Sequence, residues 1–182
     1  MADTKQFNPL PLLSVKNGLD SSLATINAEL ESYFNGGLEG IEHLQLAHDE
    51  LHRSVGVLQM LSLEGLAVFC RELETVLQEM LVQQQAPTSL HRDTLRGAML
   101  ALAQYLDALA DGASNTALRL FYSYQELHQL RGLESAFEVD LFFPEFGVEL
   151  PAEVLDVPLV ASAAASVKKA RAQYQRALLK WL

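Results

Sequence analysis

Three histidines and two acidic residues gather in one short stretch of the chain: His43, His48, Asp49, Glu50 and His52. His48 and His52 are four residues apart, a spacing that places both imidazoles on one face of a helix, where they could grip one metal ion. The string HDELH fails as a zinc-protease motif, because such a motif requires a glutamate directly after the first histidine or directly before the second. No third ligand stands at a useful spacing. We therefore predict solvated polar residues on the outer face of a helix, with no metal site and no cofactor.

The other residues that could do chemistry do not form a catalytic set. The sequence has no GxSxG string and no glycine-rich phosphate loop. The carboxylate pairs Glu29 with Glu31 and Glu72 with Glu74 are two positions apart, so on a helix their side chains point away from each other. The single cysteine, Cys70, excludes an internal disulfide and falls on a core-facing position, where we expect a buried, inert thiol. The sequence therefore predicts a protein that is not an enzyme.

Composition and charge narrow the class of protein. The 182 residues are enough to bury a core, as one domain or as a domain with an extension. The net charge of −10 argues against a nucleic-acid partner. The sequence has no apolar run of membrane-spanning length, and its start lacks the basic and apolar regions of a signal peptide. We therefore expect a cytoplasmic protein without a membrane span.

The basic residues are unevenly distributed. From residue 162 onward the chain has five basic residues and no acidic one, whereas the preceding part has eight basic against 23 acidic residues. The apolar stripe of the basic segment needs burial, so we expect an amphipathic helix that docks on the acidic body rather than one that faces a membrane or a partner.

Apolar residues recur at helical spacing over most of the chain. Turn residues interrupt this pattern at Asn35-Gly36-Gly37, at Pro87 and at Asp111-Gly112, and Ser62 offers an N-cap for the helix that follows it. The predicted helices cover about residues 14–34, 38–61, 63–80, 89–110, 115–130 and 159–182. From residue 139 to 158 the chain is instead rich in aromatic residues and proline and has no helical period. We expect these aromatic side chains to pack on the helices.

These elements predict an all-α fold, an up-and-down bundle of four antiparallel helices with one or two appended C-terminal helices. Thr88 or Ser89 is expected to cap the fourth helix, and Tyr122 is expected on the apolar stripe of the fifth. The expected segments are an N-terminal tail (1–13), the helical bundle (14–136), an irregular Phe/Pro-rich segment packed on it (137–158) and a basic amphipathic helix of the same domain (159–182).

The stretch HRSVGVLQMLSLEGLAVFCRELE, which begins at His52, resembles without a gap the signature of histidine-phosphotransfer (Hpt) domains. That family shows a phosphoacceptor histidine, a lysine three residues on and a glycine four residues on, then a turn and a closing Leu-Glu on the next helix. The matching residues here are His52, Gly56, Leu63, Leu66, Leu73 and Glu74. The resemblance implies an Hpt-like four-helix core, with His52 at the phosphoacceptor position.

Two positions depart from the Hpt pattern. Ser62 replaces the first glycine of the turn, and Val55 stands where the family has the lysine that would steady a phosphoryl group. We therefore expect a degenerate Hpt-like module that docks a protein partner. The expected contact residues are His48, His52, Val55, Gly56 and Gln59. The alternatives are an active phosphotransfer domain that uses His52 and a purely structural or dimerising bundle.

A narrower resemblance covers more of the chain. The strings TALRLFYSYQELHQLRG, DLFFPEF and YQRALLKWL, with the stretch at His52, resemble the N-terminal region of ChpA/PilL-type chemotaxis hybrid kinases and of the related stand-alone protein FimL. Those proteins act in the chemotaxis-like pathway that controls type IV pili, twitching motility and cyclic-AMP signalling. The resemblance implies CheY-like response regulators, a FimV-like polar hub protein and a sensor kinase as partners, and recruitment to the cell pole.

Overall fold

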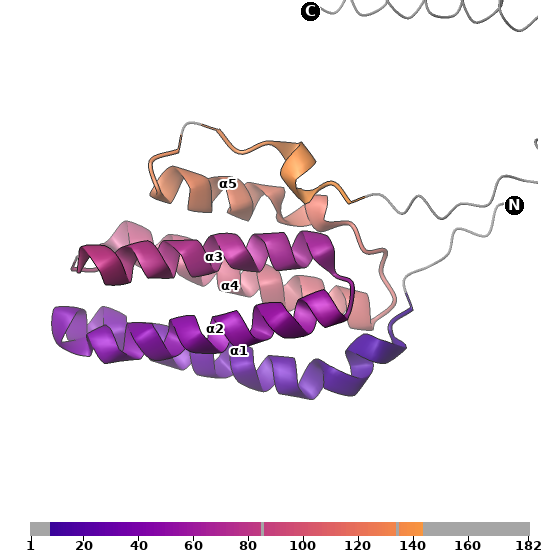
Figure 1. Ribbon diagram of the computed structural model, residues 1–182, viewed down its shortest axis with the longest axis horizontal. Helices are drawn as coiled ribbons and strands as arrows, with labels where there is room; N and C mark the ends of the chain where they lie inside the picture. The colour runs from indigo at the N-terminus through magenta and orange to yellow at the C-terminus, as the bar shows by residue number, and fades with distance from the viewer. Residues whose placement is uncertain (1–7, 85, 134, 144–182) are drawn as a thin grey trace, which may run out of the picture. The chain divides into compact units, whose positions relative to one another are not determined.

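The computed structural model describes residues 8–84, 86–133 and 135–143, and these residues are mostly helical (Figure 1). The five α-helices of this part are α1 (Leu10–Gly36), α2 (Ile41–Met60), α3 (Glu64–Gln83), α4 (Ser89–Ala110) and α5 (Phe121–Leu130). Three 3-10 helices accompany them: η1 (Gly37–Gly40), η2 (Ala117–Leu120) and η3 (Glu138–Leu141). The described residues contain no strand. The predicted all-α fold is therefore confirmed for this part of the chain.

The chain divides into two compact units, Met1–Glu145 and Phe146–Leu182. The second unit lies outside the described residues, and with it the predicted basic helix (159–182) and most of the irregular segment. No described helix is both long and apolar enough to cross a membrane.

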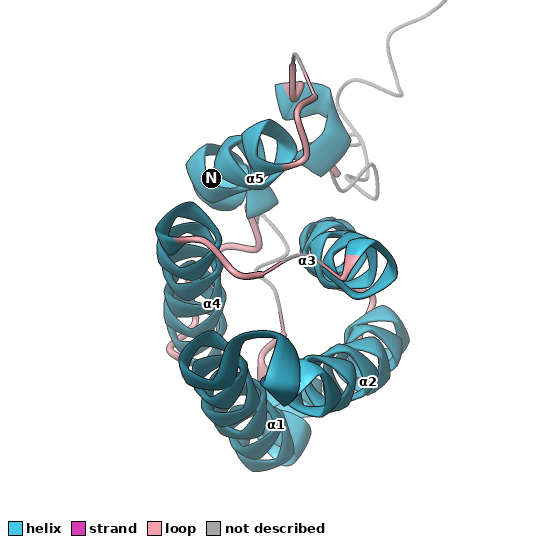
Figure 2. Cartoon of the chain, turned by 90° about the vertical axis from the view of Figure 1, so that its left-hand side faces the viewer, coloured by secondary structure: helices cyan, strands magenta, loops and turns pink. Residues whose placement is uncertain are grey.

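Helices α1 to α4 run up and down side by side, and the view along their axes shows them arranged around a shared interior (Figure 2). In sequence order α1 packs on α2 and α2 on α3, while α4 returns to contact α1. The shorter α5 lies outside this group and packs on α3 and α4. The neighbouring helices α2 and α3 are antiparallel, which brings the middle of one beside the middle of the other.

The apolar stripes of the sequence form the core. The expected stripe residues of α1 to α4 that are buried include Leu19, Leu23, Ile26, Leu30, Tyr33, Leu44, Ala47, Leu51, Leu58, Leu66, Cys70, Leu73, Leu77, Met80, Leu95, Met99, Leu102, Leu106 and Leu109. Each fully buried leucine contributes about 1.5–3 kcal/mol of transfer free energy, so this stripe is the main source of stability. Cys70 is buried as expected, and this burial raises the pKa of its thiol.

The stripe expected on the fifth helix is only partly correct. Tyr124 and Leu127 are buried, but Tyr122 is 71% exposed. The reason is that α5 lies on the outside of the other helices, so only one of its sides is covered. This helix also begins at Phe121 rather than near Asn115, because the preceding residues form the 3-10 turn η2.

Both ends of α1 follow from local chemistry. The helix begins at Leu10, four residues before the predicted start at Ser14, because Pro11 sits in the first turn, where a missing N–H is tolerated. It ends at Gly36, and the next residue, Gly37, has a positive φ of 60°. The helix end predicted at the Asn-Gly-Gly string is thus confirmed.

Of the two predicted N-caps, the one of α4 is correct and the one of α3 is not. Thr88 caps α4 as expected: its hydroxyl accepts the backbone N–H of His91 at 3.2 Å. The prediction that Ser62 caps α3 is wrong, because Leu63 holds the N-cap position. Ser62 instead has a φ of 57° and ends α2, in the left-handed conformation in which glycine is favoured.

Only the first residues of the predicted irregular segment are described. Leu141 is buried against α3, whereas Phe137, Phe142 and Phe143 are 58%, 55% and 48% exposed. The segment approaches Gly65 of α3 closely, because an added Cβ there would lie 3.2 Å from Cδ2 of Phe143 and 3.5 Å from the backbone oxygen of Leu141. The expected packing of the segment therefore holds for Leu141, but the expected burial of its aromatic side chains is wrong for these three.

Candidate functional site

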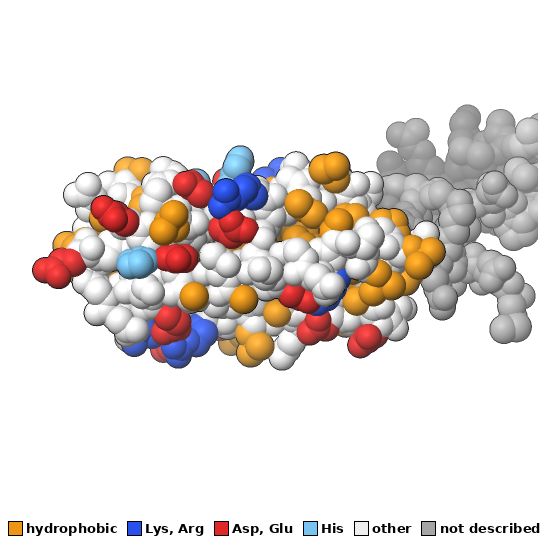
Figure 3. Space-filling view, turned by 90° about the horizontal axis from the view of Figure 1, so that it is seen from below, with side chains coloured by type: hydrophobic (Ala, Val, Ile, Leu, Met, Phe, Trp, Pro, Cys, Tyr) orange, Lys and Arg blue, Asp and Glu red, His pale blue; other side chains and the backbone are white. Residues whose placement is uncertain are grey.

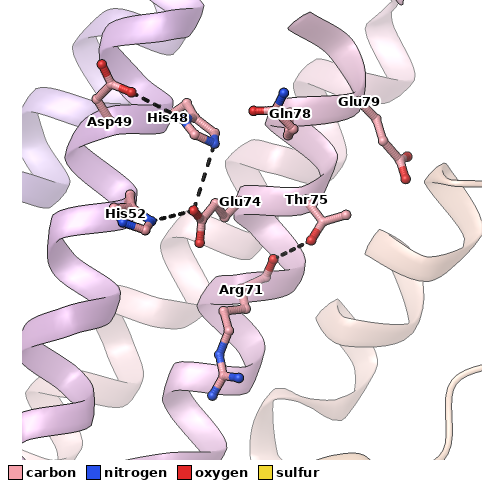
Figure 4. A pocket seen from close by; sticks show the side chains of 8 residues that line it. All are labelled: His48, Asp49, His52, Arg71, Glu74, Thr75, Gln78 and Glu79. Carbon is pink, nitrogen blue, oxygen red and sulfur yellow. Dashed lines mark hydrogen bonds and ion pairs between the residues drawn. The ribbon is translucent and has the colours of Figure 1, made fainter. Parts of the chain in front are cut away.

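An open groove of about 560 Å³ lies along the contact between α2 and α3 (Figure 4). The residues that line it are His48, Asp49, His52, Arg71, Glu74, Thr75, Gln78 and Glu79. The first three come from α2 and the other five from α3, so the groove exists only because these two helices pack together. Every one of these side chains is polar or charged.

His52 is the most accessible nucleophile of this groove. Its Nδ1 lies 2.7 Å from Oε1 of Glu74, across the helix contact, and its side chain is 71% exposed (Figure 4). A carboxylate can only accept a hydrogen bond, so Nδ1 carries the proton and the lone pair of the neutral ring is on Nε2. The partner carboxylate is held more firmly, since the Glu74 side chain is only 20% exposed. The contact thus fixes one ring nitrogen and leaves the other available.

His48 lies one turn earlier on α2 and turns toward the same carboxylate (Figure 4). Its Nε2 is 3.9 Å from Oε1 of Glu74, and its side chain is 16% exposed, so it is more buried than an outer-face residue was expected to be. Its Nδ1 lies 3.3 Å from Oδ1 of Asp49. The pKa of the Asp49 carboxyl is lowered, mainly by a hydrogen bond from Gln45 and next by one from His48. His48 is therefore a partly buried neighbour of the site.

The remaining members of the polar stretch face another helix. Nδ1 of His43 lies 2.6 Å from Oε2 of Glu29 on α1. A hydrogen bond with Ser22, also on α1, is the main cause that lowers the pKa of the Glu50 carboxyl. Helical geometry thus divides the five residues between two neighbours, α1 and α3. Among the described residues no group of three or more His, Cys, Asp and Glu side chains is arranged to hold a metal ion.

The prediction that Val55 belongs to the contact surface is wrong. It is 5% exposed and belongs to the core, because it follows the buried Leu51 by four residues on the same stripe. Gly56 and Gln59 are exposed as expected, and an added Cβ at Gly56 would meet no atom within 4 Å. The accessible surface near His52 therefore contains Gly56 and Gln59 without Val55.

Sequence reasoning missed Arg71, the cation of the groove. It lies three residues before Glu74 on α3, so both side chains are on one face of that helix. Its Nε donates to the backbone carbonyl of Ala67 at 3.3 Å, and its side chain forms no ion pair within the described residues. The sequence does contain a clue to this residue. Arg71 stands three residues before Glu74, the glutamate of the closing Leu-Glu, and this spacing places both on one face of a helix.

A second polar cluster joins α5 to α3. Arg131 binds Glu72 through Nη1 at 2.7 Å and Glu79 through Nε at 2.9 Å. Both hydrogen bonds raise the pKa of Arg131, and the one to Glu79 has the larger effect. His128 stacks on Tyr124 with 4.5 Å between ring centroids, and its Nε2 lies 3.5 Å from Oε1 of Glu72. The cluster is mostly covered, so its role is to hold α5 in place.

Apolar side chains also reach the surface. Figure 3 shows them gathered toward one end of the face formed by α1 and α2. Near that end, Leu10, Leu13 and Met60 are 68%, 48% and 88% exposed. Met60 is four residues beyond Gly56 and eight beyond His52, and these steps keep all three on one side of α2.

No family model, no curated protein and no solved structure matches this chain.

Proposed function

We propose that this chain is a histidine-phosphotransfer-like interaction module that binds a signalling protein on the exposed side of α2 and α3. The observation that carries the proposal is His52. It stands on a rigid helix at the edge of an open groove, anchored by the carboxylate of Glu74 at 2.7 Å. One turn later Gly56 has no side chain, so a partner can approach the helix backbone closely beside the imidazole.

The burial of Val55 changes which residue supplies the apolar contact. Interfaces derive most of their binding energy from a few well-packed anchors surrounded by polar residues. Met60, which is 88% exposed on the same side of α2, can supply such an anchor because its side chain is flexible and apolar. The proposed contact surface is therefore His52, Gly56, Gln59 and Met60.

The resemblance to ChpA/PilL-type kinases and FimL suggests where this module acts. We propose a role as a scaffold in the chemotaxis-like control of type IV pili, twitching motility and cyclic-AMP signalling. The corresponding partners are CheY-like response regulators, a sensor kinase and a FimV-like hub protein that recruits the module to the cell pole. The net charge of −10 agrees with a protein rather than a nucleic-acid partner.

Binding to a purified CheY-like receiver or FimV-like protein tests this surface. Met60→Asp and Gly56→Arg should each weaken the Kd at least about tenfold, or about 1.4 kcal/mol, because they place a charge or a bulky side chain in the contact. Leu100→Asp is the matched control, since Leu100 is 59% exposed on α4, a helix that contributes no residue to the proposed surface. Equal affinity for all three variants and the natural chain would contradict the proposal.

The second candidate function is phosphotransfer through His52. The geometry that favours it is the hydrogen bond from Nδ1 to Glu74, which leaves Nε2 as the nucleophile of an exposed ring. Incubation with the cognate kinase and labelled ATP should give an acid-labile label that is lost in His52→Gln. Label on a competent Hpt control, without label on this chain, would leave docking as the function.

A further inference from the structure

We infer that Arg71 supplies the positive charge that binds a phosphoryl group on His52, in place of the lysine that this chain lacks. This inference rests on the second candidate function, phosphotransfer through His52. The chain has Val55 at the position of that lysine, and Val55 is buried in the core. A phosphoryl group on Nε2 would carry about two negative charges. It therefore needs a cation from another element.

The antiparallel packing of α2 and α3 places Arg71 on the correct side of His52. Glu74 contacts His52 directly, and Arg71 lies three residues earlier on α3. Because the two helices run in opposite directions, a step back along α3 corresponds to a step forward along α2, toward Gly56. Figure 4 shows the guanidinium of Arg71 beyond the His52–Glu74 pair in that direction. The guanidinium thus lies beside the part of α2 from which the family's lysine would extend.

The charges around the groove leave Arg71 available for an anion. The carboxylates that line the groove have other partners: Asp49 accepts from Gln45, Glu74 from His52 and Glu79 from Arg131. Arg71 is bound by none of them, and its only hydrogen bond within the described residues is the one from Nε to a carbonyl of its own helix. Its two terminal nitrogens can therefore form the paired hydrogen bonds with which guanidinium binds phosphate.

Among the described arginines from α2 onward, Arg71 and Arg119 form no ion pair and no hydrogen bond to another helix, and of these two only Arg71 lines the groove. Other arginines there hold fixed partners within the described residues: Arg53 binds Glu50, Arg92 binds the carbonyl of Phe34, Arg96 binds Glu31 and Arg131 binds Glu72 and Glu79. Arg53 is adjacent to His52 in sequence, yet it is turned toward the groove between α1 and α2. It therefore serves as a matched control for Arg71.

Phosphoramidate provides a test that needs no kinase. The lone pair on Nε2 of His52 attacks phosphorus and forms an N–P bond, while the P–N bond of phosphoramidate breaks. Its nitrogen takes up a proton from water and leaves as ammonia. The Nδ1 proton stays hydrogen-bonded to Glu74, which balances the positive charge that develops on the ring. Arg71 binds the phosphoryl oxygens throughout.

The experiment follows phosphohistidine on the full chain by ³¹P NMR, together with its acid-labile loss. Arg71→Gln should slow phosphorylation and shorten the lifetime of the phosphohistidine, each by about tenfold or more. Arg71→Lys should restore part of both, and Arg53→Gln should leave both unchanged. Added salt should slow phosphorylation of the natural chain but have little effect on Arg71→Gln, since the attraction that is screened is missing there. His52→Gln should remove the signal.

The outcomes separate this inference from the function on which it rests. Phosphorylation of His52 that is equally fast and equally long-lived in Arg71→Gln and in the natural chain overturns the role of Arg71 and leaves phosphotransfer standing. Failure of the natural chain to react, under conditions in which free imidazole reacts, overturns phosphotransfer and the role of Arg71 together. A loss of rate in Arg53→Gln as large as in Arg71→Gln would mean a general charge effect, which also contradicts the assignment.

Discussion

The turn between α2 and α3 contains a residue in a conformation that its side chain disfavours. The N–H of Ser62 donates to the carbonyl of Gln59 at 2.9 Å, and the N–H of Leu63 donates to that of Leu58 at 3.1 Å. These two bonds form a Schellman motif, in which the residue at the position of Ser62 is usually glycine. Ser62 adopts a φ of 57° there, although it has a Cβ. We therefore predict that Ser62→Gly stabilises the protein.

The size of this effect follows from two opposing contributions. A residue with a Cβ pays about 1–2 kcal/mol for the left-handed conformation. Glycine loses more chain entropy on folding, which offsets about 0.5–1 kcal/mol of that gain. The hydroxyl of Ser62 is exposed and makes no hydrogen bond to another described residue, so little else changes. The free energy of unfolding should rise by about 0.5–1 kcal/mol, and the Tm by about 1–4 °C.

Thermal and urea unfolding followed by circular dichroism measure this change. The chain supplies a control of opposite sign, because Gly112 closes α4 with the same bond pattern at a φ of 88°. Gly112→Ser should lower the free energy of unfolding by about 1 kcal/mol or more. If Ser62→Gly leaves stability unchanged or reduces it while Gly112→Ser is costly, the argument from backbone strain at Ser62 is refuted.

Three further perturbations have defined outcomes. Gly65→Ala should cost about 1–3 kcal/mol in urea unfolding, because the new Cβ would meet that of Ala117 at 2.4 Å. Thr88→Ala removes the cap of α4 and should cost about 1 kcal/mol in thermal unfolding. The free energy of unfolding should fall as the pH rises from about 10 to 12. Burial raises the pKa of Tyr105 and Tyr124 to about 12, whereas unfolded tyrosine loses its proton near pH 10. Tyr105→Phe should make this fall in urea-derived stability shallower.

Matched controls accompany these changes. Gly97→Ala is the control for Gly65, since an added Cβ at Gly97 meets nothing within 4 Å and should stabilise α4 slightly. Ser89→Ala alters the neighbour of Thr88 without removing a cap, so it should leave stability nearly unchanged. For the tyrosines, the decrease of the free energy of unfolding with pH above pH 10 is compared between the natural chain and Tyr105→Phe. An equally steep decrease in both would contradict the assignment of this titration to Tyr105.

The sequence predicted the parts of this protein that depend on neighbours along the chain. The spacing of the leucines gave the helices and the residues of their buried faces, because 3.6 residues per turn is a property of the local backbone. Gly37 and Gly112 marked helix ends for an equally local reason, the freedom of glycine at positive φ. The cap of α4 was predicted at Thr88 or Ser89, just after the helix-breaking Pro87, and Thr88 holds it.

The errors arise where two helices meet. Val55 was expected both on the apolar stripe, four residues after Leu51, and on the contact surface, three residues after His52. The structure buries it in the core, so only the first expectation is correct. Tyr122 is exposed because α5 lies outside the other helices, which its own periodicity does not reveal. Ser62 ends α2 instead of capping α3, since the turn geometry that joins two packed helices set its φ.

By itself, the sequence determined that the described chain is helical, which leucines form most of its buried stripes, and that His52 lies on a helix surface. Only the tertiary structure decided that Glu74 holds the imidazole and that Arg71 lines the same groove. His52 and Glu74 are 22 residues apart in sequence, and their approach depends on the direction and register of α3 against α2. That register follows from how the two apolar stripes pack against each other, a non-local property that no single helix contains.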